Sequence, residues 1–202
     1  MSKLAKTPKG TARYLKIVKP DTRFDAVGLY EGELILRGEE AEQFKGVIDA
    51  HITEAVKENT KDGKKPKKAK PPYKTFIDDE GQEDGISFRF KMKAKYETRK
   101  GDVVRQKPAI FDAKGTPITD PNFAVGNGSV VKIAYRVRPW NVAGNGCGVT
   151  LSPMAVQVIN LVPYSANSDG FDFEEEEGFE WEQGQTENEG QKIFSEEEED
   201  DF

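Results

Sequence analysis

One segment of the chain alternates strictly between apolar and polar side chains. In ISFRFKMKAKY, at residues 86–96, apolar residues such as Phe88 and Phe90 occupy every second position, and Arg or Lys fills most of the positions between them. Because successive side chains of a β-strand point to opposite faces of a sheet, this pattern predicts a strand with one apolar face and one cationic face. It is the clearest strand in the sequence.

Other β-prone runs, each bounded by turn residues, predict further strands at residues 13–18, 29–36, 103–111, 129–140 and 148–162. Residues 39–61 instead have apolar side chains at helical spacing, with acidic residues in the first turn, and predict one helix. Many strands with one helix favour a mainly β fold. We expect an OB-like five-stranded barrel in which the helix is inserted as a plug or cover.

The net charge of −6 conceals two regions of opposite sign. Residues 165–202 hold 16 of the 36 acidic residues and only Lys192 of the 30 basic ones, which leaves 20 acidic and 29 basic residues before them. The first part therefore carries +9 and the tail −15. We predict a flexible basic arm at 1–12, a globular domain at 13–164 and a disordered acidic tail at 165–202.

A lysine-rich segment interrupts the predicted domain. Residues 61–72, KDGKKPKKAKPP, contain six lysines and three prolines. Such a composition predicts an extended, mobile basic loop, because repeated prolines prevent helix formation and the lysines repel one another.

Single-stranded nucleic acids are bound by cations that follow the phosphates and by aromatic rings on which bases stack. The candidate cations lie on three predicted strands and the lysine-rich segment: Arg89, Lys91, Lys93, Lys95, Arg105, Lys107, Lys132, Arg136, Arg138, Lys64, Lys65, Lys67, Lys68 and Lys70. The candidate stacking residues are Trp140, Tyr73, Phe76, Tyr96 and Tyr135. Tyr73 and Trp140 adjoin prolines and basic segments, which favours exposure, whereas Tyr135 is in phase with Val131 and Ile133, which favours the core. A cationic strand face can also be an ordinary solvated surface.

Little in the sequence suggests catalysis. Cys147 has no second thiol and His51 no histidine partner, so neither a zinc site nor a cysteine–histidine pair can be assembled. The carboxylates at 78–84 crowd into one glycine-containing turn, which favours a solvated loop over a metal site. We expect no enzyme activity, metal or cofactor. No apolar run approaches the roughly 20 residues of a membrane helix, and a cytosolic protein is expected.

The acidic tail interleaves its carboxylates with aromatic rings, which solubility alone does not require. It ends in EEEEDDF, formed by Glu196, Glu197, Glu198, Glu199, Asp200, Asp201 and Phe202. Such an end can act as a flexible polyanion over the cationic groove of the domain, with the terminal ring in an apolar pocket of this chain or of a partner.

The basic strand at 86–96, the segment GCGVTLSPMAVQVINLV at 146–162 and the acidic tail with terminal Phe202 resemble the single-stranded DNA-binding proteins of tailed phages. The resemblance implies an OB fold and a role in phage DNA replication, recombination and repair, in the cytoplasm of the infected bacterium. It also implies that residues 196–202 shield the DNA groove and recruit DNA polymerase and helicase–primase. Some members of the family are dimers, so a homodimer is compatible with the resemblance.

Two other hypotheses fit the same electrostatics. An RNA-binding or chaperone-like OB protein would share every feature above, and competition between DNA and RNA oligonucleotides of one sequence would distinguish it. An adaptor whose basic domain binds an acidic protein would show no quenching of Trp140 by oligo-dT.

Overall fold

The alternating segment forms most of strand β5 (Glu83–Lys93). Phe88 and Phe90 are completely buried, while Arg89, Lys91 and Lys93 are exposed, so the two predicted faces of this strand are confirmed. The strand ends at Lys93, three residues before the predicted end. Residues Lys95–Glu97 form β6, which pairs with β7 (Val103–Arg105) in a separate two-stranded hairpin.

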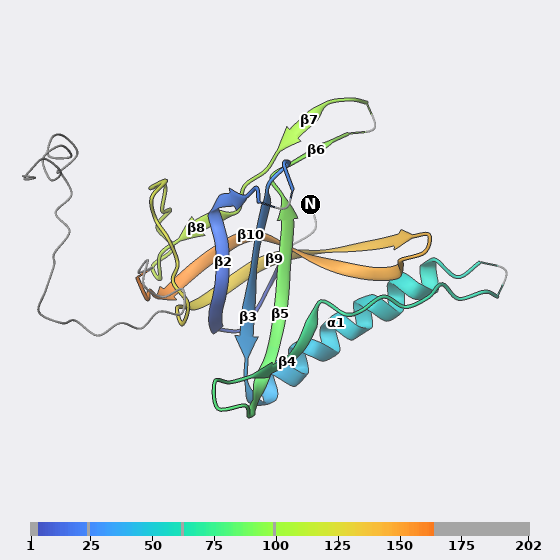
Figure 1. Ribbon diagram of the computed structural model, residues 1–202, viewed down its shortest axis with the longest axis horizontal. Helices are drawn as coiled ribbons and strands as arrows, with labels where there is room; N and C mark the ends of the chain where they lie inside the picture. Colours follow the sequence, from blue (N-terminus) through green and yellow to red (C-terminus); the bar gives the residue numbers. More distant parts are fainter. Residues whose placement is uncertain (1–3, 24, 62, 99, 164–202) are drawn as a thin grey trace, which may run out of the picture. The chain divides into compact units, whose positions relative to one another are not determined.

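The computed structural model describes residues 4–23, 25–61, 63–98 and 100–163. Within them, five strands close into a ring in the order β9, β2, β3, β5, β10 and back to β9 (Figure 1). These are β2 (Gly10–Asp21), β3 (Leu29–Leu36), β5, β9 (Val130–Val142) and β10 (Gly146–Asn160). The neighbours are antiparallel except β5 and β10, which run parallel. The predicted mainly β, OB-like barrel is confirmed.

Three short strands extend the ring. The strand β1 (Ala5–Lys6) pairs with β9, β4 (Tyr73–Ile77) pairs with β5, and β8 (Ala109–Phe111) runs parallel to β10. Strand β10 has a bulge between Pro153 and Ala155. Before the bulge β10 pairs with β5, and after it β10 pairs with β8. The loop after β7 is thereby brought back against the barrel.

The helix α1 (Gly38–Glu58) packs against β3, β5, β9 and β10. Its buried residues recur at three- and four-residue spacing: Ala41, Phe44, Ile48, Ile52 and Ala55. The Phe44 ring contacts Phe88 at 4.7 Å and Tyr135 at 5.6 Å between centroids, so the helix packs against the barrel core, as expected for a plug or cover. It ends three residues before the predicted Lys61. The Asn59 and Thr60 side chains donate hydrogen bonds to the Ala55 and Val56 carbonyls there.

The first residues of the chain take part in the sheet. The proposed arm at 1–12 contains β1 and the start of β2, and Thr7 exchanges hydrogen bonds of 3.0 Å with the backbone of Ile133. The sequence gives little sign of this, because no hydrophobic period marks these residues. Gly10 is buried although it has no side chain, and a Cβ there would lie 2.7 Å from the Ile35 carbonyl oxygen. The domain therefore begins before residue 13. Residues 165–202, the predicted disordered tail, lie outside the described residues.

One glycine faces the barrel interior where no side chain has room. Gly32 of β3 pairs with Phe90, and an added Cβ would lie 2.4 Å from Leu15 Cδ1 and 2.9 Å from Leu15 Cα. We expect Gly32→Ala to lower the free energy of unfolding by about 1–3 kcal/mol, because it overpacks the core. Urea denaturation measures the change. The matched control is Gly46→Ala, since Gly46 is exposed within α1 with no atom within 4 Å of an added Cβ; it should stabilise the protein by up to about 1 kcal/mol. Equal effects of the two substitutions would contradict this explanation.

Candidate nucleic-acid interface

The register of three strands places two rows of cations on one surface. Leu151 of β10 pairs with Phe90 of β5 and with Val137 of β9, and all three side chains point into the barrel. Because side chains alternate along a strand, the residues on either side of these three point outward. These outward cations are Arg89, Lys91 and Lys93 of β5 and Arg136 and Arg138 of β9. We call this surface the outer face.

The two rows are separated by β10, so their backbones lie about 10 Å apart. Gln106 links them, because its amide nitrogen donates to the Lys93 carbonyl at 2.7 Å and its oxygen lies 3.4 Å from an Arg138 guanidinium nitrogen. Arg138 is consequently half-buried, whereas Arg136 and Lys91 are exposed. A chain of phosphates could meet cations on both sides of β10.

The cationic face of β5 is partly neutralised by β3 and the loop before it. Arg89 forms a 2.8 Å ion pair with Glu31, Lys74 pairs with Glu33 at 3.1 Å, and Lys93 lies 4.0 Å from Asp25. Within the described part of the chain, Lys91 and Arg136 form no ion pair. The alternation along one strand could not predict this pairing, because the carboxylates come from other segments. Lys91 and Arg136 are thus the outer-face cations most available to an added anion.

Glu33 remains ionised among these cations. Burial alone would raise the pKa of its carboxyl, but hydrogen bonds from Ser87 Oγ and Lys74 Nζ outweigh that effect and lower the pKa. The outer face is therefore a mixed surface in which cations are in excess.

Trp140 also lies on the outer face. It pairs with Gly148, where an added Cβ would lie 3.0 Å from the indole ring and 3.1 Å from the Ala69 Cβ. Its indole therefore lies over β10, next to the lysine-rich segment. It is half-buried, which leaves part of the ring accessible to a base.

The lysine-rich segment is attached to the sheet. Cys147 accepts a hydrogen bond from Ala69 N at 2.9 Å and donates one to the Lys67 carbonyl at 2.8 Å, so residues 67–69 run beside β10. Gly146, at φ +97°, permits this approach because a Cβ would lie 2.4 Å from the Lys67 carbonyl oxygen. The composition of the segment had predicted a mobile loop and gives no sign of this attachment. All six of its lysines are exposed: Lys61, Lys64, Lys65, Lys67, Lys68 and Lys70. Figure 1 shows the segment beside the β9–β10 hairpin and the end of α1.

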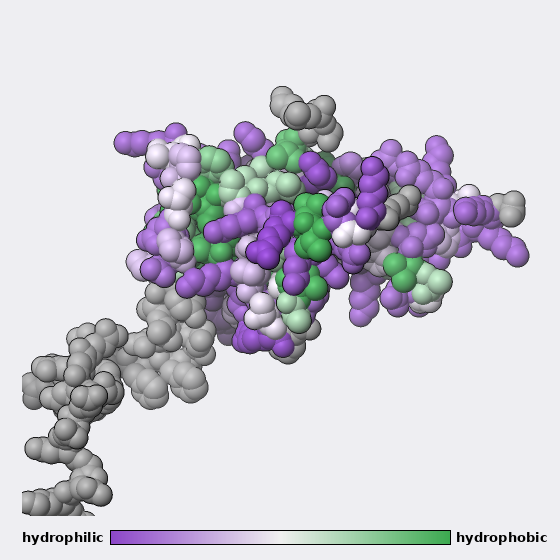
Figure 2. All heavy atoms as spheres, turned by 90° about the horizontal axis from the view of Figure 1, so that it is seen from above, coloured by the Kyte–Doolittle hydropathy of each residue, from purple (hydrophilic) through white to green (hydrophobic). Residues whose placement is uncertain are grey.

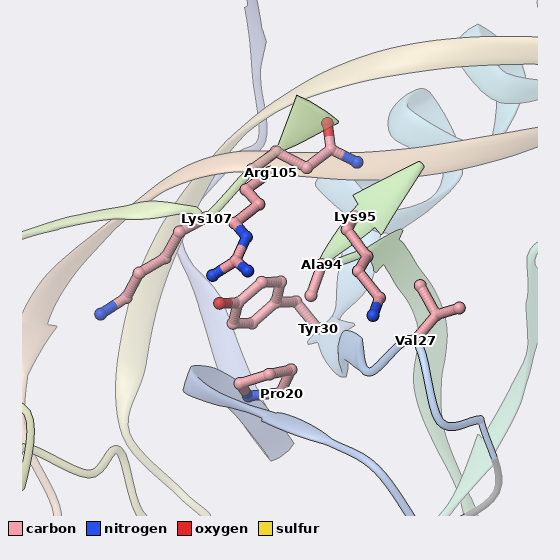
Figure 3. Close-up of a pocket in the computed structure, with 8 residues that line it drawn as sticks. Pro20, Val27, Tyr30, Ala94, Lys95, Arg105 and Lys107 are labelled. Atoms are coloured by element: carbon pink, nitrogen blue, oxygen red, sulfur yellow. The ribbon is translucent and has the colours of Figure 1, made fainter. Parts of the chain in front are cut away.

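Three other predicted cations gather at one end of the barrel. Lys95, Arg105 and Lys107 line an open pocket of about 440 Å³ whose apolar wall is formed by Pro20, Val27, Tyr30 and Ala94. The side chain of Arg105 points toward the Tyr30 ring (Figure 3). Burial raises the pKa of the Tyr30 hydroxyl, which stays neutral. The residues that line the pocket include these three cations and no carboxylate, so its charge is positive. From the side of the β6–β7 hairpin, hydrophilic residues dominate the surface, with apolar patches between them (Figure 2).

Two of the predicted stacking residues are not available on the outer face. The Tyr135 ring is 2% exposed and packs against Phe44 and Phe90, so its placement among the stacking candidates is corrected. Tyr73 was expected to be exposed, but its ring lies 5.7 Å from Phe88 and its hydroxyl donates to Asp49 at 2.6 Å. Burial and that hydrogen bond raise the pKa of Tyr73 to about 12. Strand β4 turns Tyr73 toward the helix.

The remaining candidates lie on different elements. Phe76 is half-buried on β4 beneath Arg13, Tyr96 is 41% exposed on β6, and Lys132 pairs with Gln157 farther along β9. Arg13, Tyr14 and Tyr30 were not among the candidates, because the runs at 13–18 and 29–36 were interpreted as ordinary apolar strands. Nothing in a single sequence marks the bulge that exposes Tyr14.

The described residues show no group of three or more His, Cys, Asp or Glu side chains that could hold a metal ion. Cys147 is buried and unpaired. None of the described helices is both long and apolar enough to span a membrane.

A closed five-stranded barrel with a helix plug, and with cations and an indole ring on the outer face of β5, β9 and β10, defines an OB-type nucleic-acid-binding protein. A family model described as the single-stranded DNA-binding protein of bacteriophage T7 matches residues 10–161. The chain belongs to this family, and the resemblance noted in the sequence is confirmed.

Solved structures give the same fold. The crystal structure of gp2.5, a single-stranded DNA-binding protein encoded by bacteriophage T7, matches with a TM-score of 0.65 and 22% identity, over 90% of this chain and 100% of that one. The single-stranded DNA-binding protein of bacteriophage Enc34 in complex with single-stranded DNA matches with a TM-score of 0.60 and 14% identity, over 79% and 88%. A comparison of the sequence with curated proteins finds no match.

Proposed function

We propose that this protein coats single-stranded DNA on the outer face of its barrel, with little sequence preference, and protects it during phage DNA replication and recombination. Membership in the family of phage single-stranded DNA-binding proteins supports the ligand class. A solved structure of the Enc34 protein, which has the same fold, is of its complex with single-stranded DNA.

The observation that carries the proposal is the pair of cationic rows on either side of β10, with Trp140 at one end. Leu151 faces inward with both Phe90 and Val137, so the rows necessarily share the opposite surface. Cations that contact the phosphates, next to an aromatic ring accessible to bases, bind single strands of any sequence, because every base has a π-face. The lysine-rich segment extends the cationic surface beside Trp140.

A direct test is the binding of the full chain to labelled oligo-dT, its duplex with oligo-dA, and the RNA of the same sequence, by fluorescence anisotropy across salt concentrations. We expect the single-stranded DNA to be preferred. With four to six phosphate contacts, log K should fall with log salt at a slope of about −3 to −4, since each contact to a single strand contributes about −0.7. Preference for the duplex would contradict the proposal.

The same experiment distinguishes the two alternatives. Tighter binding of the RNA would favour an RNA-binding or chaperone-like protein. Absence of binding to every oligonucleotide, with no change in tryptophan fluorescence, would favour an adaptor for an acidic protein. Since a folded and family-matched barrel is common to all three hypotheses, only the choice of ligand separates them.

The tail has two further roles in the proposal. Its 16 acidic residues compete with DNA for residues 1–164, which carry +9, and its end, Glu196 to Phe202, recruits replication proteins such as DNA polymerase and helicase–primase. The opposite charges of the two regions support the first role. The aromatic residue at the end of six acids supports the second. Formation of a homodimer belongs to the same proposal and can be measured by analytical ultracentrifugation.

A further inference from the structure

Strand β2 contains a bulge that turns two consecutive side chains outward. Arg13 pairs with Glu33 of β3, and the next pairing is Lys16 with Glu31, so β2 has an extra residue between these pairs. Tyr14 lies at this point with φ +51° and is the only non-glycine residue of positive φ among those described. Ala12 and Leu15, on either side of the Arg13–Tyr14 pair, are buried, whereas Tyr14 is 58% exposed.

The left-handed conformation at Tyr14 is unfavourable for a residue with a Cβ, and a glycine would adopt it without strain. It is held in place by Asn127, whose Oδ1 accepts a 2.7 Å hydrogen bond from the Tyr14 amide. The exposed ring packs into no core, so burial does not explain why a large aromatic residue occupies this position. Local strain of this kind is a reason to look for a function.

The Tyr14 ring belongs to a stack of alternating rings and cations. The Arg13 guanidinium carbon lies 5.0 Å from the Tyr14 centroid and 5.4 Å from the Phe76 centroid, and the Arg37 guanidinium carbon lies 6.0 Å from the Phe76 centroid. Arg13 Nη2 also donates to the Tyr14 hydroxyl at 3.3 Å, and Arg37 is anchored to Asp84 at 2.7 Å. The outermost ring is therefore supported from beneath, which lowers the entropy lost when a ligand stacks on it.

The stack is continuous with the outer face. In the strand register, Glu33 of β3 lies directly between Arg13 of β2 and Arg89 of β5, the first cation of the β5 row. One transverse row of residues thus leads from the Tyr14 stack, across β3, to the cationic rows on either side of β10. Neighbouring strands are about 4.8 Å apart, so the stack begins about 10 Å from Arg89.

We propose that Tyr14, supported by Arg13 and Phe76, is a stacking site for an unpaired base at the β2 edge of the interface, and that Arg13 contacts the neighbouring phosphate. This inference rests on the proposed function and adds a subsite to it. A base fits because its flat π-face matches an exposed ring at a cationic edge.

The central experiment compares Tyr14→Gly with the unmodified chain. Removing the ring should weaken the binding of oligo-dT about 5- to 150-fold, the range observed for the loss of one base–aromatic stack. The same substitution should raise Tm by about 2–4 °C, because glycine relieves the left-handed conformation. A variant that becomes more stable and binds more weakly identifies a residue retained for its ligand. Anisotropy titration and thermal unfolding measure the two effects.

Two further variants separate the ring from the backbone. Tyr14→Phe keeps the ring and should bind within about twofold of the unmodified chain, whereas Tyr14→Leu keeps the strain without the ring and should bind as weakly as Tyr14→Gly. Val47→Ala, which truncates an exposed apolar side chain on α1, is the control for DNA binding and should leave it unchanged. Photocrosslinking to oligonucleotides with 5-iododeoxyuridine should yield an adduct at Tyr14 or Phe76.

The outcomes are distinguishable from a failure of the proposed function. If the unmodified chain does not bind oligo-dT, the proposed function is wrong and this inference falls with it. If the unmodified chain binds but Tyr14→Gly and Tyr14→Leu bind equally well, the function stands and the Tyr14 site is wrong. Crosslinks confined to Trp140 and the lysine-rich segment would likewise overturn the site alone.

Discussion

Replacing Lys91 and Arg136 together by alanine is expected to weaken the binding of oligo-dT about 25-fold at 0.1 M salt. These two side chains are exposed on opposite sides of β10, and neither forms an ion pair in the described part of the chain. Each lost phosphate contact should make the slope of log K against log salt about 0.7 less steep, so the double variant should lose about 1.4 from it. Anisotropy titrations at several salt concentrations give both quantities.

The matched control for this experiment is Lys45→Ala with Lys114→Ala. It removes the same net charge from α1 and from the turn at 112–116, away from the outer face. We expect its salt slope to remain close to that of the unmodified chain. If the two double variants weaken binding equally, general attraction by the +9 charge of residues 1–164 would account for the affinity, and the outer face would not be a defined interface.

The paired cation Arg89 offers an internal comparison. Its guanidinium group is bound to Glu31 at 2.8 Å, so a phosphate must compete with a carboxylate for it. Arg89→Ala should therefore change the salt slope less than Lys91→Ala does. This difference follows from the ion pairs and from no feature of the strand's own sequence.

Removal of residues 165–202 is expected to raise the affinity for single-stranded DNA about tenfold or more at low salt and to make its salt dependence steeper. The tail carries −15 and the remaining chain +9, so the same cations attract both the tail and a DNA strand. As salt screens both interactions, the difference between the intact and shortened chains should shrink. Parallel titrations of the two proteins between low and high salt measure the effect.

A tail of unchanged length in which Asn and Gln replace all 16 acidic residues is the control for this deletion. If charge is the cause, the neutral tail should behave like the deletion; if steric covering is the cause, it should behave like the intact chain.

Deleting only Phe202 leaves the acids in place. In that variant DNA binding should remain near that of the intact chain, while capture of DNA polymerase or helicase–primase should be lost. An affinity unaffected by both the deletion and the neutral tail would show that the tail does not compete with DNA.

The helix and most barrel strands could be predicted, because in each of them the buried apolar side chains recur with the period of a helix or a strand. Phe44, Ile48 and Ile52 recur on one side of a helix, and Phe88 and Phe90 on one side of a strand. The short strands β1 and β4 have no such period, and the run predicted as one strand at 103–111 is divided into β7 and β8. Strands β1, β4 and β8 are ordered by hydrogen bonds to strands far away in the chain, and a short segment need not be amphipathic to form them.

The candidate site was predicted less completely than the fold. The exposure of Arg89, Lys91 and Lys93 follows from alternation along one strand. Tyr73 was misassigned because a proline and a basic segment precede it, whereas its orientation depends on pairing with Phe88 and on the hydroxyl's hydrogen bond to Asp49. Tyr14 was placed in an apolar run, although a bulge set by the pairing with β3 turns its ring outward.

Local periodicity and charge are properties of neighbouring residues. The amino-acid sequence alone therefore indicated a mainly β barrel, one helix, a cationic strand face and an acidic end of opposite sign. Which cations remain available, which rings face outward and where the lysine-rich segment attaches depend on residues far apart in the chain. Glu31 neutralises Arg89 from the next strand, and Cys147 holds the segment at Lys67 and Ala69. Only the closed barrel brings these partners together, because strand pairing sets the register across which their side chains meet.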